Sequence, residues 1–231
     1  MRRVIIVAVG VTLLVSGCKA TKTDSSRSSE PSPTDGVVTA LSQPDETATP
    51  SLSMAGVVVS DASSTVVQPQ PAAGTCHQRG SGTYALQDAH CTPGALNPAV
   101  TQSTIGSTIC VRGYTRTIRP SSSITGREKV ASLGSYGDPV NPSAYEYDHL
   151  ISLELGGAAN DARNLWPEPG GSPNPKDSLE NRLHSLVCSG QLTLFDAQKS
   201  IVTNWVMAYR TYVGATPASN PAPTRATATP G

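Results

Sequence analysis

Aromatic residues, net charge and long apolar runs are all scarce in this chain of 231 residues. Aromatic side chains make up 4% of the sequence, and none lies between Thr23 and Gly74. The 17 Lys and Arg residues balance 17 Asp and Glu residues, so the zero formal net charge argues against a nonspecific polycation. The apolar run from Val4 to Val15 is shorter than the ~20 residues that span a bilayer comfortably. This run is therefore more typical of a targeting signal than of a membrane span.

The first 17 residues have the order of a secretory signal peptide. Two arginines, the apolar run and small residues follow one another ahead of Cys18. The ending Val15-Ser16-Gly17-Cys18 resembles a bacterial lipobox, which implies cleavage before Cys18 and acylation of that residue. The alternative is an ordinary cleaved signal in which Cys18 is incidental. With acylation, we expect an exported protein that is lipid-anchored at the outer face of the cell membrane.

Composition divides the rest of the chain into one packed domain and two tails. Residues 18–75 are rich in Ser, Thr and Pro and predict a disordered tether, because such a segment cannot bury enough apolar surface. The run Gly56–Val59 is an alternative strand, but no strand partner stands beside it in the sequence. All 2 Trp, 7 Tyr and 1 Phe residues lie between Tyr84 and Tyr212. We therefore expect a single domain at residues 76–214 and a disordered tail at 215–231.

Basic residues are concentrated in one stretch of this domain. Between residues 110 and 129 the only acidic residue is Glu128, against the basic residues Arg112, Arg116, Arg119, Arg127 and Lys129. A basic strip can guide a phosphate backbone even in a neutral protein. The alternative interpretation is a solvated strand edge.

Four cysteines besides Cys18 agree with export. Their even number predicts two disulfides in an oxidising compartment, with three possible connectivities among Cys76, Cys91, Cys110 and Cys188. Cys76-His77 and His90-Cys91 also offer four zinc-type ligands, although their spacing matches no strong zinc pattern.

Two helices are expected near the C-terminus. Asn174 is a suitable N-cap, Pro175 suits the first helical position, Asp177 falls in the first turn and Gly190 supplies a stop. The buried stripe expected on this helix consists of Leu179, Leu183, Leu186 and Val187. A second helix begins with the capping box of Thr193 and Asp196, and its packed face consists of Ala197, Ile201, Val202, Trp205, Tyr209 and Val213.

The stretch before these helices has the pattern strand, turn, strand. Apolar residues after Asp148-His149, from Leu150 to Leu155, suggest a strand that Gly156-Gly157 breaks. Residues 160–165 form a loop that leads into a second strand. A histidine and a carboxylate on the first strand can then face the Asp177 helix across a small cleft.

Asp148-His149, Gly156-Gly157 and Asn164-Leu165, followed by a helix, resemble an HNH nuclease, the ββα-metal finger of colicin nucleases and many homing and restriction enzymes. Residues 91–213 resemble more closely a group of bacterial exported or phage-associated HNH-like proteins, although Ser152 stands where many relatives have proline. The resemblance implies an α+β fold: a small domain with a ββα-metal core, a C-terminal helix and disulfide staples.

The resemblance also implies roles for individual residues. His149 takes a proton from the attacking water, as an imidazole with a reference pKa near 6.5 can, and Asn164 bonds across the loop and holds the histidine. Asp148 is the expected metal ligand on the strand. Asn174, Glu180, Asn181 and His184 compete for the second metal position, and Glu180 and His184 are preferred because residues four apart share a helix face. The phosphate contacts are assigned to Lys176, Arg116 and Arg119.

The implied activity is metal-dependent hydrolysis of phosphodiester bonds in nucleic acid, most simply DNA with weak sequence preference. The expected cofactor is a divalent metal ion, Mg²⁺ or Mn²⁺ first, with Zn²⁺ or Ni²⁺ as alternatives. The alternative function is a noncatalytic surface lipoprotein that uses an HNH-like scaffold as a binding module.

Overall fold

The computed structural model describes residues 54–138 and 141–215, which belong to one compact unit of mixed helix and strand. The signal peptide expected at residues 1–17, the acylated Cys18 and nearly all of the tail expected at 215–231 lie outside the described residues. The elements in chain order are β1 (Val58–Val59), η1 (Gly82–Tyr84), β2 (Ala95–Leu96), η2 (Ile105–Ser107), α1 (Tyr114–Ile118), α2 (Ser122–Ser135), η3 (Pro142–Ala144), β3 (Tyr145–His149), η4 (Leu153–Leu155), β4 (Leu165–Pro169), α3 (Pro175–Cys188) and α4 (Leu194–Tyr212).

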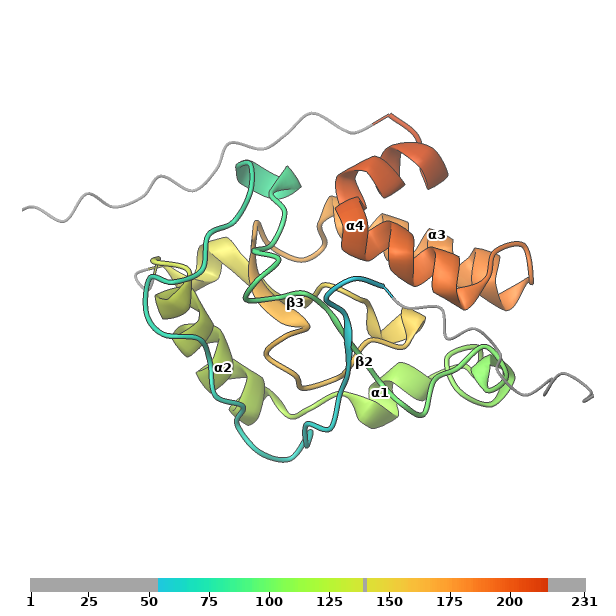
Figure 1. Cartoon of the computed structure of the whole chain (residues 1–231), viewed down its shortest axis with the longest axis horizontal. Helices are drawn as coiled ribbons and strands as arrows, with labels where there is room; N and C mark the ends of the chain where they lie inside the picture. The colour runs from blue at the N-terminus through green and yellow to red at the C-terminus, as the bar shows by residue number, and fades with distance from the viewer. Residues whose placement is uncertain (1–53, 139–140, 216–231) are drawn as a thin grey trace, which may run out of the picture. The chain divides into compact units, whose positions relative to one another are not determined.

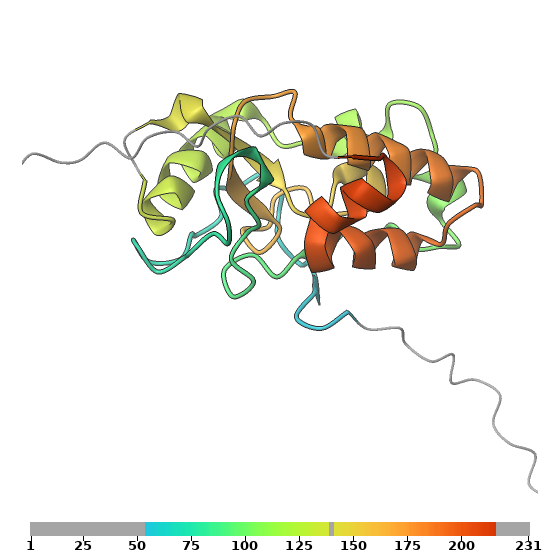
Figure 2. The same cartoon turned by 90° about the horizontal axis from the view of Figure 1, so that it is seen from above.

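An antiparallel hairpin of β3 and β4 lies at the centre of this unit, between α2 on one side and the paired helices α3 and α4 on the other (Figures 1 and 2). The register pairs Tyr145 with Pro169 and His149 with Leu165. Because successive side chains of a strand point to opposite faces, Glu146 and Asp148 share one face of the hairpin. Asn174, the N-cap of α3, donates to Glu146 on that face over 3.0 Å. The order β3, β4, α3 therefore places Asp148 and His149 on the same ββα unit as Lys176, Glu180 and His184.

The first strand of the ββα unit lies earlier in the chain than the sequence pattern predicted. Residues 150–155 were expected to be strand, but β3 stops at His149 and the chain turns into the 3₁₀ helix η4. The Ser152 side chain accepts a hydrogen bond from the Glu154 N–H and starts this turn. Leu150, Ile151, Leu153 and Leu155 are all buried, so they lack the alternation of a half-buried strand.

The two C-terminal helices form as predicted except at Val213, which follows the last residue of α4 and is exposed instead of packed. Asn174 accepts from the backbone N–H groups of Lys176 and Asp177, and Asp177 accepts from the Asn174 N–H, which completes a capping box. The Thr193 hydroxyl accepts from the Asp196 N–H at the start of α4. The core between these helices and η4 contains the predicted Leu179, Leu183, Val187, Ala197, Ile201, Trp205 and Tyr209.

The basic stretch forms helices rather than a strand edge. Residues 114–118 are α1 and residues 122–135 are α2, which packs against β4. Helix α2 has few apolar residues and no clear apolar stripe, so its sequence carries little periodic signal. Its contacts include Glu128, fully buried, which accepts from the Gln68 N–H at 2.6 Å.

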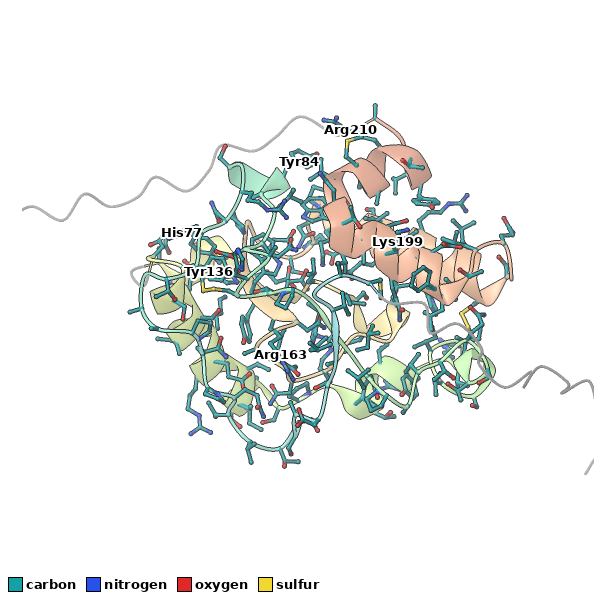
Figure 3. The ribbon with its side chains drawn as sticks, in the orientation of Figure 1. His77, Tyr84, Tyr136, Arg163, Lys199 and Arg210 are labelled. Carbon is teal, nitrogen blue, oxygen red and sulfur yellow. A yellow bond between two sulfur atoms is a disulfide. The ribbon has the colours of Figure 1, made fainter. Side chains whose placement is uncertain are left out.

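Residues 54–75 pack against the domain, which corrects the boundary expected at residue 76. Strand β1 pairs in parallel with β2, and Ser60 donates to Asp161 over 2.7 Å. Asn160 donates to the carbonyls of Ser63 and Val66. Arg163, labelled in Figure 3, bridges Asp161 and Asp61. The disordered tether therefore does not extend through residues 54–75.

A chain that begins at Cys76 is expected to be less stable than one that begins at Met54. The lost bonds include those of Ser60 to Asp161 and of the Gln68 N–H to buried Glu128. Each such bond contributes about 1 kcal/mol net, so the free energy of unfolding should fall by at least ~2 kcal/mol. Urea unfolding of the two chains measures the difference. Equal unfolding free energies would contradict the packing of residues 54–75.

Two disulfides close the fold. Cys76 pairs with Cys91 and Cys110 pairs with Cys188, which selects one of the three connectivities. The first pairing joins the two cysteines of the alternative zinc set, so their sulfurs are not free thiolates. The second pairing links the segment before α1 to the end of α3.

No helix within the described ranges is long and apolar enough to cross a membrane.

Candidate active site at His149 and Lys176

His149 ends β3 with its ring held by the loop that precedes β4. The ring Nε2 lies 3.0 Å from the Ala159 carbonyl oxygen. A carbonyl only accepts, so Nε2 carries the proton and Nδ1 keeps its lone pair. Among residues 54–138 and 141–215 no hydrogen bond to Nδ1 occurs. The ring is therefore fixed in the tautomer that leaves a basic nitrogen free.

Asn164 fastens the loop that positions this ring. It is fully buried, and its amide nitrogen donates to the carbonyls of Ile151 and Ala158, both over 3.0 Å. Its amide oxygen accepts from the Ile151 N–H at 3.0 Å. The predicted bond across the loop is confirmed, but Asn164 acts through Ala158 and Ala159. Its bonds go to the backbone of this loop, and its side chain is not exposed.

Gly157 allows the same loop to close. A Cβ on Gly157 would lie 1.7 Å from the Ile151 carbonyl oxygen and 2.8 Å from the Asn164 amide nitrogen. A backbone oxygen cannot rotate away, so any larger residue must displace the loop.

Gly157→Ala is expected to lower the free energy of unfolding by about 3 kcal/mol through this overlap. The matched control is Gly171→Ala, because no heavy atom lies within 4 Å of a Cβ there. Urea unfolding should separate the two variants. If both stay within about 0.5 kcal/mol of the parent chain, the tight contact with Ile151 is refuted.

Burial keeps the His149 ring neutral. His149 is 7% exposed, and desolvation of its ring lowers the pKa from 6.5 to about 4. Asp148 and the bond to Ala159 oppose this shift, whereas the positive charges of Arg119 and Lys176 add to it. At neutral pH the free Nδ1 can accept a proton, although its basicity is low.

The lowered pKa of His149 predicts acid destabilisation. Between pH 6.5 and about 4 the unfolded chain binds a proton at His149 that the folded chain does not bind. Folding stability therefore falls as the pH falls through this interval, by about 2 to 3 kcal/mol, and is restored above pH 6.5. Subtracting the pH profile of His149→Gln from that of the parent chain isolates the effect. Parallel profiles would show that the His149 pKa is not lowered.

Lys176 is buried at the centre of a group of carboxylates. Its Nζ donates to Asp148 over 2.5 Å, to Glu180 over 2.5 Å and to the His149 carbonyl over 2.7 Å. Glu168 lies 3.8 Å from the same nitrogen. These four residues, Asp148, Glu168, Lys176 and Glu180, are called the Lys176 cluster. Because an ammonium group has three N–H donors, all of its donors are used.

The charges of the Lys176 cluster depend on one another. Burial opposes the charge of Lys176, but Asp148, Glu180 and Glu168 together raise its pKa well above the usual value. Burial raises the pKa of Glu180 to about 7, against the opposing effect of Lys176. Burial also raises the pKa of Glu168 well above its usual value, and the neighbouring Asp148 and Glu180 add to this rise, whereas Lys176 opposes it. Lys176 and His149 hold the pKa of Asp148 below its usual value despite burial.

Lys176 does not have the predicted role of a phosphate contact. Its side chain is 0% exposed and every N–H has a partner. A phosphate could reach the ammonium only after the cluster opened. Glu168 was not predicted as a site residue from the sequence. It is the one charged residue of β4, whose five residues are all buried, and an isolated charge in an apolar strand could have indicated its role.

The divalent metal implied by the resemblance does not fit this arrangement. Asp148, Glu168 and Glu180 supply the carboxylate oxygens that Mg²⁺ and Mn²⁺ prefer. The point on which these oxygens converge is filled by the Lys176 ammonium. A divalent ion there requires displacement of a buried, covalently attached cation, so no catalytic step is assigned to a metal.

His184 does not join Asp148 and Glu180. Its Nε2 lies 2.9 Å from the Ile109 carbonyl oxygen, beside the second disulfide. Ligand atoms of Cys110, His184 and Cys188 lie within 4.8 Å of one another, so this group could hold a metal. Both sulfurs are bonded in the disulfide, and thiolate ligands would exist only after reduction.

The exposed side of the site is basic and lies next to a hollow. Arg119 is exposed just after α1, and its positive charge acts on His149. Arg116 is also exposed, but no interaction with His149 occurs for it in the described part of the chain. A hollow of about 450 Å³ is lined by Thr117, Ile118, Ala158 and Ala159, among others. Its wall includes Ala159, the residue whose carbonyl holds the His149 ring, so this hollow adjoins the loop beside the ring.

A second hollow, of about 290 Å³, lies at the first disulfide. His77 and Tyr136, both labelled in Figure 3, contribute to its wall. None of the predicted catalytic residues lines it.

Comparisons of the chain with known protein families, with curated proteins and with solved structures found no match.

Proposed function

We propose that this chain hydrolyses phosphodiester bonds in nucleic acid, with the HNH-like ββα unit as its active site and His149 as the general base. Water gives a proton to His149 Nδ1 and its oxygen attacks phosphorus. The bond to the leaving oxygen then breaks, and that oxygen takes a proton from solvent. Arg119 contacts the phosphate and offsets the charge that develops on it.

One observation carries this proposal. The His149 ring is neutral and its Nε2 is fixed to Ala159 at 3.0 Å, while Nδ1 keeps a free lone pair. Asn164 and Gly157 hold the loop that carries Ala159, so the protein fixes the orientation of the ring before any substrate binds. An oriented base beside an exposed arginine is the arrangement that general-base hydrolysis requires.

The alternative is a noncatalytic binding module on the same scaffold. The Lys176 cluster favours it, because Asp148 and Glu180 are already paired inside the protein. The balanced charge of the chain also limits tight binding of nucleic acid.

Cleavage assays decide between the two functions. The protein is incubated with supercoiled plasmid, single-stranded DNA and RNA, each with EDTA, Mg²⁺ or Mn²⁺. Product that appears with the parent chain and is lost in His149→Ala supports hydrolysis and identifies the substrate. Retention of a labelled nucleic acid without cleavage supports the binding module. Product that survives unchanged in His149→Ala rejects His149 as the base.

The proposed location is the outer face of the cell membrane. The signal order before Cys18 and the two disulfides support an exported, lipid-anchored protein. Mass spectrometry of the mature N-terminus tests this, since a diacylated Cys18 is expected. A free N-terminus elsewhere would reject the anchor.

A further inference from the structure

Lys176 stands where a positive charge is unfavourable for the helix that carries it. It lies in the first turn of α3, where the helix dipole disfavours cations. It is also 0% exposed, and burying an ammonium group has a large desolvation penalty. Neither helix stability nor solvation explains this position, so the surrounding carboxylates must determine it.

Those carboxylates come from three elements and meet at one point. Asp148 of β3 and Glu180 of α3 each place an oxygen 2.5 Å from Nζ, and Glu168 of β4 lies at 3.8 Å. Both Glu168 side-chain oxygens are buried; they make no hydrogen bond of ordinary length and angle among the described residues, and one of them pairs with Nζ at 3.8 Å. Three buried carboxyl groups directed at one point, one of them without a close hydrogen-bond partner, indicate a site for a cation.

We infer that the Lys176 ammonium is the resident cation of this site in place of a divalent metal ion, and that removing the amine turns Asp148, Glu168 and Glu180 into a divalent-cation site. An ammonium and a divalent ion cannot share these oxygens, because two cations a few ångströms apart repel strongly in a buried place. The inference concerns cation binding and does not rest on the proposed hydrolysis.

The parent chain gives the first test. Its Mn²⁺ binding is followed by electron paramagnetic resonance, and its thermal midpoint is compared in EDTA and in millimolar Mn²⁺, Mg²⁺ or Ca²⁺. No binding that depends on Asp148 is expected, and the midpoint should not move. Mn²⁺ binding that disappears in Asp148→Asn would overturn the inference.

Lys176→Ala gives the second test. It leaves a space bounded by the three carboxylates, so Mn²⁺ should bind at least tenfold more tightly than to the parent chain. The midpoint of this variant should rise by about 5 °C on addition of Mn²⁺. In Lys176→Met the methionine fills the space without a charge, so no such rise is expected. Lys199→Ala, at an exposed lysine on α4 (Figure 3), should behave as the parent chain does.

Each outcome bears on the inference. A folded Lys176→Ala variant without added Mn²⁺ affinity would show that the carboxylates do not form a cation site, and would overturn it. If that variant does not fold in EDTA, refolding in the presence of Mn²⁺ supports the inference and failure to refold opposes it. A chain that cleaves no nucleic acid leaves every one of these binding results unchanged, so the proposed function fails separately.

Discussion

His149→Gln is expected to lower the rate of nucleic-acid cleavage by about 10² to 10⁴, the contribution of a positioned general base. Glutamine keeps an amide N–H that can donate to the Ala159 carbonyl, which His149 Nε2 contacts at 3.0 Å. It has no basic nitrogen to replace Nδ1. The variant therefore removes proton transfer to residue 149 but keeps its hydrogen bond to the loop at Ala159. Initial rates with a labelled oligonucleotide, at saturating and at low substrate, measure the loss.

The matched control is His90→Gln, because His90 is exposed and lies outside the ββα unit. Its rate should equal that of the parent chain. The loss in His149→Gln should fall on kcat, since the ring takes its proton in the transition state. A loss confined to KM would instead make His149 a binding residue, and an equal loss in both variants would indicate general damage.

Lys176→Met is expected to lower the free energy of unfolding by about 3 to 5 kcal/mol, the usual result of removing one partner of a buried ion pair. Methionine has a similar length, so the volume at this fully buried position is nearly kept. The loss arises because Asp148 and Glu180 stay buried without the ammonium that each contacts at 2.5 Å. Urea unfolding at pH 8 measures it.

The penalty should be smaller at pH 5 than at pH 8. Without Lys176 the carboxylates of Asp148 and Glu180 bind protons more readily, and protonation removes their repulsion. Lys199→Met changes an exposed residue and should stay within about 0.5 kcal/mol of the parent chain. A Lys176→Met variant as stable as the parent chain at both pH values would show that the cluster contributes no net stability.

Helices α3 and α4 were predictable because their signals are local. Asn174, Pro175 and Asp177 act within one turn, and the capping box that they suggest is present. At the start of α4 only half of the predicted capping box forms: the Thr193 hydroxyl accepts from the Asp196 N–H, and the Asp196 carboxylate accepts from that hydroxyl rather than from the Thr193 N–H. A buried stripe at helical spacing also depends only on neighbouring residues, which explains why Leu179 and Leu183 were correctly placed in the core.

The elements that were wrong depend on distant partners. The polar helix α2 has little pattern of its own and forms against β4 and against residues such as Gln68. Residues 54–75 resemble a tether in composition, and their order comes from partners such as Asp161 and Asn160. The first strand was predicted at residues 150–155 instead of 145–149, because a short apolar run is compatible with a strand or with a buried turn.

The sequence by itself determined the catalytic candidate His149, the loop residue Asn164, the two C-terminal helices and the even set of cysteines, since each has a signal within a few residues. Only the tertiary structure decided the cysteine pairing and the surroundings of Lys176. Asp148 and Glu168 are 28 and 8 residues away from Lys176 along the chain, and the folding of β3 and β4 against α3 brings them to one nitrogen. The sequence predicted Lys176 as a phosphate contact, but in the fold it is a buried cation inside the protein. The reason is that the desolvated carboxylates around it stabilise its charge more strongly than solvent or substrate can.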